Sequence, residues 1–272
     1  MLSEDRKKSI KNRVRSIMDQ FRCAVSYAIG VPLLSWRALP LSRQRYLFVL
    51  AHPRSGSTLL NRVLATNPEI ASYGENHKVY RRAFDLFLLL CRTAARLKNY
   101  SLSETYVMDK LVWPKYGMPS SIRHASNVKF IIITREPRAT FNSMARLISD
   151  WRNEQTSHGI YMDEMDWLEK EVGTINDPAR CLCVRYEDLL KNSERVFQTL
   201  RTFLHVDAPF SENYDVIKTT GDLRFGDSSE NIKAGKFRAP TPAETCCVSD
   251  DLLESANQRY LQFQKTAAPY LA

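Results

Sequence analysis

The chain has 272 residues, with 39 lysines and arginines against 30 aspartates and glutamates, and hence a formal net charge of +9 at pH 7. This length allows one domain with a full hydrophobic core and an additional segment. The positive charge indicates an anionic partner, and a nucleotide that carries several acidic groups would fit it. Nucleic acid is not expected as the partner, because there is no zinc-finger spacing, no RNP-like aromatic strand and no long basic tail.

The six cysteines form no C-x-x-C pair and no Cys/His cluster with the spacing of metal ligands, so we expect no bound metal. Most of these cysteines lie among apolar residues. Buried thiols of this kind are typical of proteins in a reducing compartment, which predicts a cytoplasmic location.

Residues 1–45 differ from the rest of the chain, which we expect to form the main domain at residues 46–272. Basic residues alternate with apolar ones between Arg6 and Phe21, as in a basic amphipathic helix. The apolar run that follows has about a dozen residues and includes Pro32, so it is too short to span a membrane. Two interpretations stay open for this segment: a helix packed on the domain, which is the commoner outcome, or peripheral contact with an anionic membrane face.

The segment at residues 51–60, AHPRSGSTLL, follows an apolar run at 46–50 and leads into apolar residues at helical spacing. This pattern predicts a buried parallel strand, a tight loop and a helix. Such a loop aims backbone N–H groups and the positive end of the helix dipole at one point, as a phosphate site requires. Five residues are candidate phosphate ligands: Arg54, Ser55, Gly56, Ser57 and Thr58.

Two other interpretations of this loop are possible. It can be an ordinary strand-to-helix turn in which Ser57 or Thr58 caps the helix. A P-loop NTPase requires G-x-x-x-x-G-K-[ST], which is absent, because there is no first glycine and Arg54 precedes the turn. The sequence PRSGSTL instead resembles the 5′-phosphosulfate loop of the sulfotransferases that use 3′-phosphoadenosine 5′-phosphosulfate (PAPS), and especially their tyrosylprotein branch.

A second segment carries the same resemblance. Residues 127–134, NVKFIIIT, predict another buried strand, and Pro137 is suited to the first turn of the helix that follows. In the sulfotransferase family an arginine at the end of this strand and a serine eight residues later bind the 3′-phosphate of the donor. Arg135 and Ser143 match that spacing. Each would be unremarkable alone, but the two segments occur in the family's order and each follows its own strand.

The resemblance also implies the catalytic residues. Glu75 lies in a segment similar to the tyrosylprotein hinge where a glutamate acts as general base, although Asn76 stands where that branch has a second glutamate. His77 is the alternative base, since cytosolic sulfotransferases use a histidine. Lys110 ends a short predicted strand at residues 106–110 and corresponds to the lysine that contacts the transferring sulfuryl group.

Three further contacts with the donor follow from the resemblance. Arg54 would join Lys110 in neutralising the leaving phosphate. Tyr186, in a Tyr-Glu-Asp-Leu sequence, would contact the adenine. Lys233 lies in a polar segment at 226–237 similar to the family's late basic loop, but this segment lacks the Arg-Lys-Gly triplet and the Gly-Asp-Trp-Lys of the cytosolic branch.

Helices are predicted at residues 79–97, 189–205 and 249–265, and residues 150–180 predict a lid over the acceptor or a surface helix. The order of strands and helices indicates an α/β fold: a P-loop-like three-layer sandwich with a central parallel sheet and helices on both faces. Ligands of such sheets bind at the carboxyl ends of the strands.

The resemblance implies transfer of a sulfuryl group from PAPS to a hydroxyl or amine, leaving adenosine 3′,5′-bisphosphate (PAP), with a small molecule the preferred acceptor over a protein or glycan. The arginines and the lysine would supply the positive charge without a metal. Two other classes stay open: a nucleotide-binding, kinase-like P-loop protein, and a non-enzymatic basic membrane-associated adaptor. The acceptor and the oligomeric state are not encoded in these motifs, because specificity lies in variable loops.

Overall fold

The computed structural model describes residues 44–76, 79–97, 99, 106–113, 118–147, 153–216, 232–237 and 247–272. Residues 1–43, which hold the predicted amphipathic segment, lie outside the described residues, as does His77. The predicted boundary between residues 45 and 46 therefore stays a prediction.

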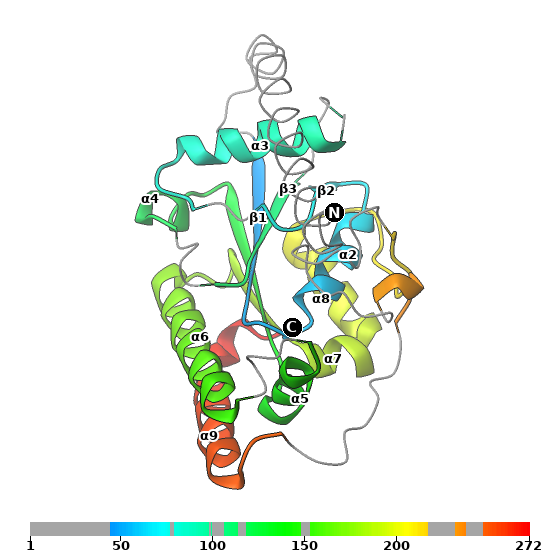
Figure 1. Ribbon diagram of the computed structural model, residues 1–272. Coiled ribbons are helices and arrows are strands. Elements are labelled where there is room, and N and C mark those ends of the chain that lie inside the picture. Colours follow the sequence, from blue (N-terminus) through cyan, green and yellow to red (C-terminus); the bar gives the residue numbers. More distant parts are fainter. Residues whose placement is uncertain are drawn as a thin grey trace, which may run out of the picture.

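A five-stranded sheet forms the centre of the described structure (Figure 1). The strands are β1 (Arg45–Ala51), β2 (Ile70–Ser72), β3 (Tyr106–Leu111), β4 (Val128–Thr134) and β5 (Cys181–Arg185). All neighbours are parallel, in the order β2-β3-β1-β4-β5, which confirms the predicted α/β fold. The central strand β1 is buried on both faces, as its continuous apolar sequence predicts for a parallel sheet.

Helices cover both faces of the sheet, giving three layers (Figure 1). On one face lie α2 (Ser57–Thr66), α7 (Tyr186–Lys191) and α8 (Ser193–Leu204). On the other lie α3 (Phe84–Leu97), α4 (Ser120–Arg123), α5 (Pro137–Leu147), α6 (Glu154–Ile175) and α9 (Asp250–Ala267). Two short 3-10 helices are η3 (Ile232–Ala234) and η4 (Ala268–Tyr270).

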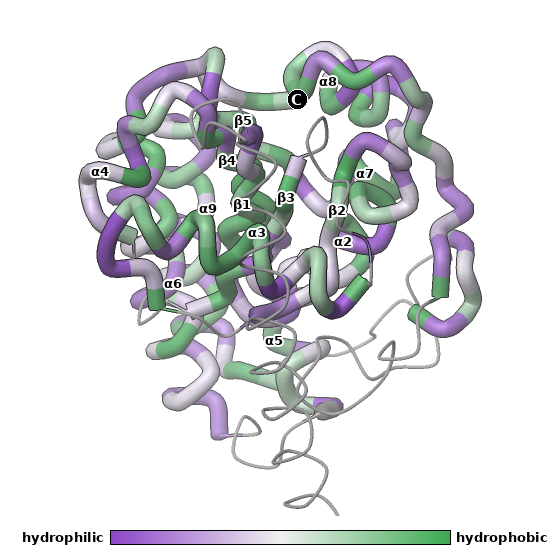
Figure 2. The backbone as a smooth tube through the Cα atoms, turned by 90° about the horizontal axis from the view of Figure 1, so that it is seen from above, coloured by the Kyte–Doolittle hydropathy of each residue, from purple (hydrophilic) through white to green (hydrophobic). Residues whose placement is uncertain are grey.

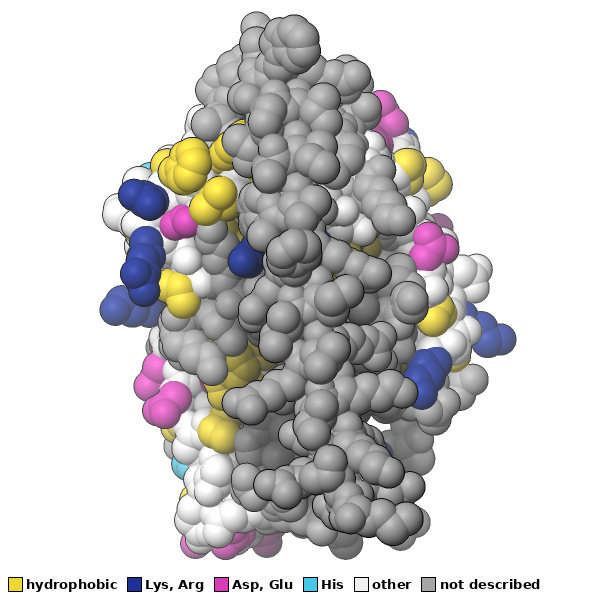
Figure 3. Space-filling model, turned by 45° about the horizontal axis from the view of Figure 1, so that its top comes forward, with side chains coloured by type: hydrophobic (Ala, Val, Ile, Leu, Met, Phe, Trp, Pro, Cys, Tyr) yellow, Lys and Arg dark blue, Asp and Glu magenta, His cyan; other side chains and the backbone are white. Residues whose placement is uncertain are grey.

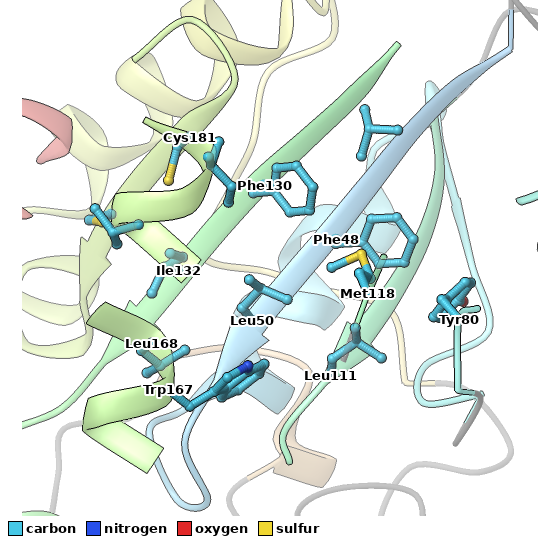
Figure 4. Packing of buried hydrophobic residues seen from close by; sticks show 14 of the residues in the cluster. Phe48, Leu50, Tyr80, Leu111, Met118, Phe130, Ile132, Trp167, Leu168 and Cys181 are labelled. Carbon is cyan, nitrogen blue, oxygen red and sulfur yellow. The ribbon is translucent and has the colours of Figure 1, made fainter. Parts of the chain in front are cut away.

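Successive residues of β1 contribute to the two hydrophobic layers in alternation. Leu47 and Val49 pack with the α2 and α8 layer, whereas Phe48 and Leu50 pack with the α3 and α6 layer. Figure 4 shows Leu50 in the same cluster as Trp167 of α6, and Figure 2 shows the most hydrophobic backbone segments at the sheet. This alternation follows from the two-residue period of a strand, and it anchors the loop after β1 between two cores.

The structure differs from the prediction at three places. Strand β2 was not predicted. Helix α3 begins at Phe84 rather than at residue 79, because the Asp85 carboxylate accepts the backbone N–H groups of Arg81 and Arg82 at 2.7 and 3.1 Å and so closes a turn before the helix. The helix predicted at 189–205 is split into α7 and α8 at Asn192.

Other predicted helices are confirmed. Residues 150–180 contain α6, a helix of 22 residues whose inner face packs against α9. The predicted C-terminal helix is α9, with Ser249 at its N-cap position.

The described part of the chain contains no helix with the length and apolar character needed to cross a membrane. Helix α3 nevertheless carries two exposed hydrophobic side chains, Phe84 and Leu97. In Figure 3, which turns the top of Figure 1 forward, hydrophobic and basic side chains lie next to each other at the surface. The side of the molecule near α3 therefore has a mixed apolar and cationic character.

Candidate functional site: two phosphate loops at the carboxyl ends of β1 and β4

The loop between β1 and α2 is built to receive an anion. Its backbone is left-handed at Arg54 (φ 65°) and at Gly56 (φ 87°), a combination that turns successive N–H groups toward one point. Helix α2 starts at Ser57 without a side-chain cap hydrogen bond, and the N-terminus of a helix directs its first backbone N–H groups and the positive end of its dipole toward the loop. The hydroxyl of Ser55 is fully buried and has no hydrogen-bond partner in the described structure.

Tyr186 packs directly on this loop. A Cβ atom added to Gly56 would lie 2.0 Å from Cδ2 of the Tyr186 ring, which is too close for any side chain. Arg135 also lies against the Tyr186 ring: its guanidinium carbon is 4.5 Å from the ring centre, as in a cation–π contact. Tyr186 thus lies against both Gly56 and Arg135, and its contact with adenine stays a prediction.

The second loop meets the first. Arg54 Nε donates a hydrogen bond to the hydroxyl of Ser143 in α5, with 3.0 Å between the atoms. Arg135 Nη1 donates to the backbone carbonyl of Arg54 at 3.4 Å. The predicted 3′-phosphate ligands therefore lie beside the predicted 5′-phosphosulfate loop, although 81 residues separate Arg135 from Arg54 in sequence.

The electrostatics of Arg135 favour a bound anion. Burial is the main cause that lowers the pKa of Arg135, and the like charge of Arg54 adds to it, while the carboxylates of Glu187 and Glu136 act in the opposite direction. Arginine nevertheless remains protonated in proteins, so burial of this cation lowers the free energy of unfolding. Its Nε atom is buried and has no hydrogen-bond partner among the residues described. A phosphate placed here would supply both the missing acceptor and the compensating charge.

Two buried side chains that the sequence analysis did not single out hold the backbone of Arg135. His52 accepts the N–H of Arg135 on its Nε2 atom at 3.1 Å, while its Nδ1 atom lies 2.9 Å from the carbonyl of Pro53. Tyr161 of α6 donates from its hydroxyl to the Arg135 carbonyl at 3.2 Å and packs edge-on to the His52 ring. The only signal in the sequence was the position of His52 between the strand and the phosphate loop.

The predicted catalytic residues come together next to the first loop. Lys110 is the penultimate residue of β3, and its Nζ atom lies 2.7 Å from Oε1 of Glu75 and 3.0 Å from the hydroxyl of Thr58. The Glu75 side chain is 13% exposed and that of Lys110 is 2% exposed. The cluster is thus recessed, with a carboxylate that can accept a proton beside an ammonium that can stabilise negative charge.

The structure does not place two predicted residues, Lys233 and His77, at the Glu75–Lys110 pair. Lys233 is an exposed residue of η3, in a segment that pairs with Asn213 through Lys236 and receives the N–H of Tyr214 at the Gly235 carbonyl. Its contact with the donor stays a prediction. His77, the alternative base, lies outside the described residues, so the choice between Glu75 and His77 stays open.

The chain is similar to known proteins of one family. A family model described as the sulfotransferase family matches residues 47–111 and 104–212, together more than half of the chain. Over 240 residues the chain is 24% identical to a Caenorhabditis briggsae protein named "Putative protein-tyrosine sulfotransferase", covering 77% of this chain and 84% of that protein. The crystal structure of mouse sulfotransferase SULT7A1 in complex with PAP is also similar: the match covers 84% of this chain and 85% of that one, with a TM-score of 0.47 and 14% identity.

The region matched by the family model contains both phosphate loops and the Glu75–Lys110 pair. The chain belongs to the sulfotransferase family, whose reaction is the transfer of a sulfuryl group from PAPS to an acceptor.

Proposed function

We propose that this protein transfers the sulfuryl group of PAPS to a hydroxyl or amine of a small-molecule acceptor, with Glu75 as the general base. The observation that carries the proposal is the contact of Lys110 with both Glu75 and Thr58. It links a candidate base to the N-terminus of α2, where the 5′-phosphosulfate would bind. Arg135 and Ser143 would bind the 3′-phosphate.

In the proposed reaction, the acceptor and the side chains of the site have separate roles. The acceptor atom forms a bond to sulfur while the bond between sulfur and the bridging phosphate oxygen breaks. The acceptor proton passes to the Glu75 carboxylate, and the electron pair of the broken bond stays on the departing bisphosphate. Lys110 and Arg54, together with the N-terminus of α2, stabilise the negative charge that develops on that oxygen.

The recessed position of Glu75 supports an acceptor whose nucleophile projects from a slim group. A tyrosine side chain has that shape as well. The name of the Caenorhabditis briggsae relative makes a tyrosine phenol the second candidate acceptor. Assays with small phenols, alcohols and amines beside a tyrosine-containing peptide would separate the two classes.

The base is tested by Glu75→Gln, which keeps the shape of the side chain but cannot accept the proton. We expect kcat to fall by about 10²–10⁴ with little change in PAP affinity. Glu136→Gln is the matched control, because Glu136 is an exposed glutamate that directly follows Arg135 but lies outside the Lys110 cluster. A loss below tenfold for Glu75→Gln, with a large loss for His77→Asn, would transfer the role to His77.

The donor is tested by thermal shift without metal. PAP at about a hundred times its Kd should stabilise the protein by about 2.7 kcal/mol. Stabilisation by ATP with Mg²⁺ in place of PAP would favour a kinase-like protein. The absence of any nucleotide-dependent shift would favour the non-enzymatic adaptor.

A further inference from the structure

We infer that Asp109 is a positioning residue that fixes the base and the lysine relative to each other. This inference rests on the proposed function, because it concerns Glu75 as the base. Asp109 is fully buried in β3 and accepts four hydrogen bonds. Its Oδ1 atom accepts from the Asn76 backbone N–H at 3.0 Å, from the Asn76 side-chain amide at 3.0 Å and from the Lys110 backbone N–H at 2.9 Å; its Oδ2 atom accepts from the Tyr80 hydroxyl at 2.6 Å.

The hydrogen-bond partners of Asp109 include Lys110 itself and the residue that follows Glu75. Asn76 directly follows Glu75, and Lys110 directly follows Asp109. A single side chain therefore holds the backbone next to both members of the 2.7 Å Glu75–Lys110 pair. Tyr80 extends the same connection toward the segment that enters α3.

The Asp109 side chain also connects the two chain segments beyond the point where the backbone hydrogen bonds between β2 and β3 end. Strands β2 and β3 pair only as far as Ser72 and Met108. Beyond that point the chain turns through Gly74, which has a φ of 101°, and Asp109 takes the place of a backbone partner for Asn76. The loop that carries Glu75 is thus tied to β3 by a carboxylate instead of by strand pairing.

Asp109 acts as an acceptor toward all four partners, as an ionised carboxylate does. Burial raises the pKa of Asp109, and the hydrogen bonds from Tyr80, Asn76 and Lys110 work against that rise. A buried carboxylate with such a set of donors is rigid, because moving any partner would leave a buried polar atom unpaired. Rigidity of this kind suits a site in which a displacement of about 1 Å can cost 10²-fold in rate.

Asp109→Ala removes the tie and is expected to lower kcat by about 10²-fold, with PAP affinity within about twofold, because the four hydrogen bonds of Asp109 go to Asn76, Tyr80 and Lys110 and not to the two loops assigned to the donor. Asp109→Asn keeps one acceptor oxygen for the three N–H groups and should recover at least tenfold of that loss. The matched control is Asp85→Asn, since Asp85 is also buried and accepts backbone N–H groups, yet does not bind the residue after Glu75. It should leave kcat within about twofold. Equal kcat losses for Asp109→Ala and Asp85→Asn would overturn the inference.

A double-mutant cycle separates positioning from simple stabilisation of the fold. If Asp109 acts through Glu75, then Asp109→Ala should lower kcat by less than about threefold once Glu75 is already Gln. Losses that multiply fully would overturn the inference while leaving Glu75 as the base. Full activity of Glu75→Gln alone would instead overturn the assignment of Glu75 as the base in the proposed function. If Asp109→Ala fails to fold, Asn76→Ala, which removes one of the three Oδ1 contacts, serves in the same cycle and should show the same non-additivity.

Discussion

The imidazole of His52 joins the two phosphate loops by accepting the backbone N–H of Arg135, with 3.1 Å between Nε2 and N. Only an unprotonated Nε2 can make this contact. Burial is the main cause that lowers the pKa of His52 to about 4, and the charge of Arg135 adds to it. The contact is therefore intact at neutral pH, and acid opposes it.

We expect His52 to make the protein acid-sensitive between pH 6.5 and 4. In this range the unfolded chain binds a proton at His52, with an ordinary pKa near 6.5, whereas the folded chain excludes it, so stability falls as the pH is lowered. The full effect is about 3 kcal/mol, and it stops growing below the folded pKa of about 4. His52→Gln places an oxygen acceptor near Nε2 but does not titrate. Urea unfolding at several pH values should show a flatter profile for this variant, and parallel profiles would contradict the prediction.

Gly56 tolerates no side chain, because its φ is 87° and the Tyr186 ring occupies the space of a Cβ. Gly56→Ala should destabilise the protein by more than the roughly 1–2 kcal/mol expected from the left-handed backbone alone. In a Tyr186→Ala background only that backbone cost should remain. Denaturant unfolding of the two pairs measures the difference. Gly159→Ala is the control, since Gly159 lies in α6 with open space around it and should be neutral or gain about 0.5–1 kcal/mol.

Lys110→Met keeps the length of the side chain and removes its charge. Because the ammonium contacts both Glu75 and Thr58, we expect kcat to fall by about 10²–10³. Lys129→Met is the matched control, because Lys129 lies near the opposite, N-terminal end of β4, which β1 separates from β3, and sits over the ring of Phe203. Steady-state rates with a simple phenol acceptor compare the two, and equal losses would argue against a role for Lys110 at the reacting atoms.

Substitution of Arg135 should lower the affinities for two nucleotides to different extents. Arg135→Ala is expected to weaken PAP by at least tenfold and adenosine 5′-monophosphate by less than about threefold, because a charge-assisted pair with the 3′-phosphate is lost only for PAP. Titration calorimetry measures both affinities. Arg138→Ala, an exposed arginine in the first turn of α5, should change neither. Equal weakening of the two nucleotides would place the 3′-phosphate elsewhere.

Removal of residues 1–43 should leave PAP binding within about twofold, because the residues assigned to the donor lie from Arg54 onward. Thermal shift on the shortened protein tests this point. Salt-sensitive binding to anionic vesicles that disappears with the deletion would support peripheral membrane contact. Loss of PAP binding would show instead that the segment forms part of the donor site.

The two loops that we assign to the donor could be placed from the sequence because each is local in the chain. A strand, a turn with a glycine and a helix start all lie within about fifteen residues, and each has its own pattern of polar and apolar residues. The first loop and the Arg135–Ser143 segment are accordingly where they were expected. The contact between them also follows, since the carboxyl ends of neighbouring parallel strands share one edge.

The supporting side chains could not be predicted, because their function depends on distant partners. His52 reaches a backbone group 83 residues away, and Asp109 reaches Asn76 across 33 residues. In the sequence, Asp109 is only a polar residue inside an apolar strand. Strand β2 was missed for another reason: three residues, Ile70–Ser72, are too few to show a period.

The strand order has a consequence for the synthesis of the protein. Among the five strands, β1 is the earliest in the chain and also the central one, so its partners β3 and β4 both follow it. From Ala51 to Val128 the difference is 77 residues, which takes roughly 4–15 s at about 5–20 residues per second. For that time one of the most apolar segments of the chain emerges from the ribosome without both neighbours. Nascent β1 is therefore a strong candidate for chaperone binding, and slower translation before residue 134 should increase aggregation.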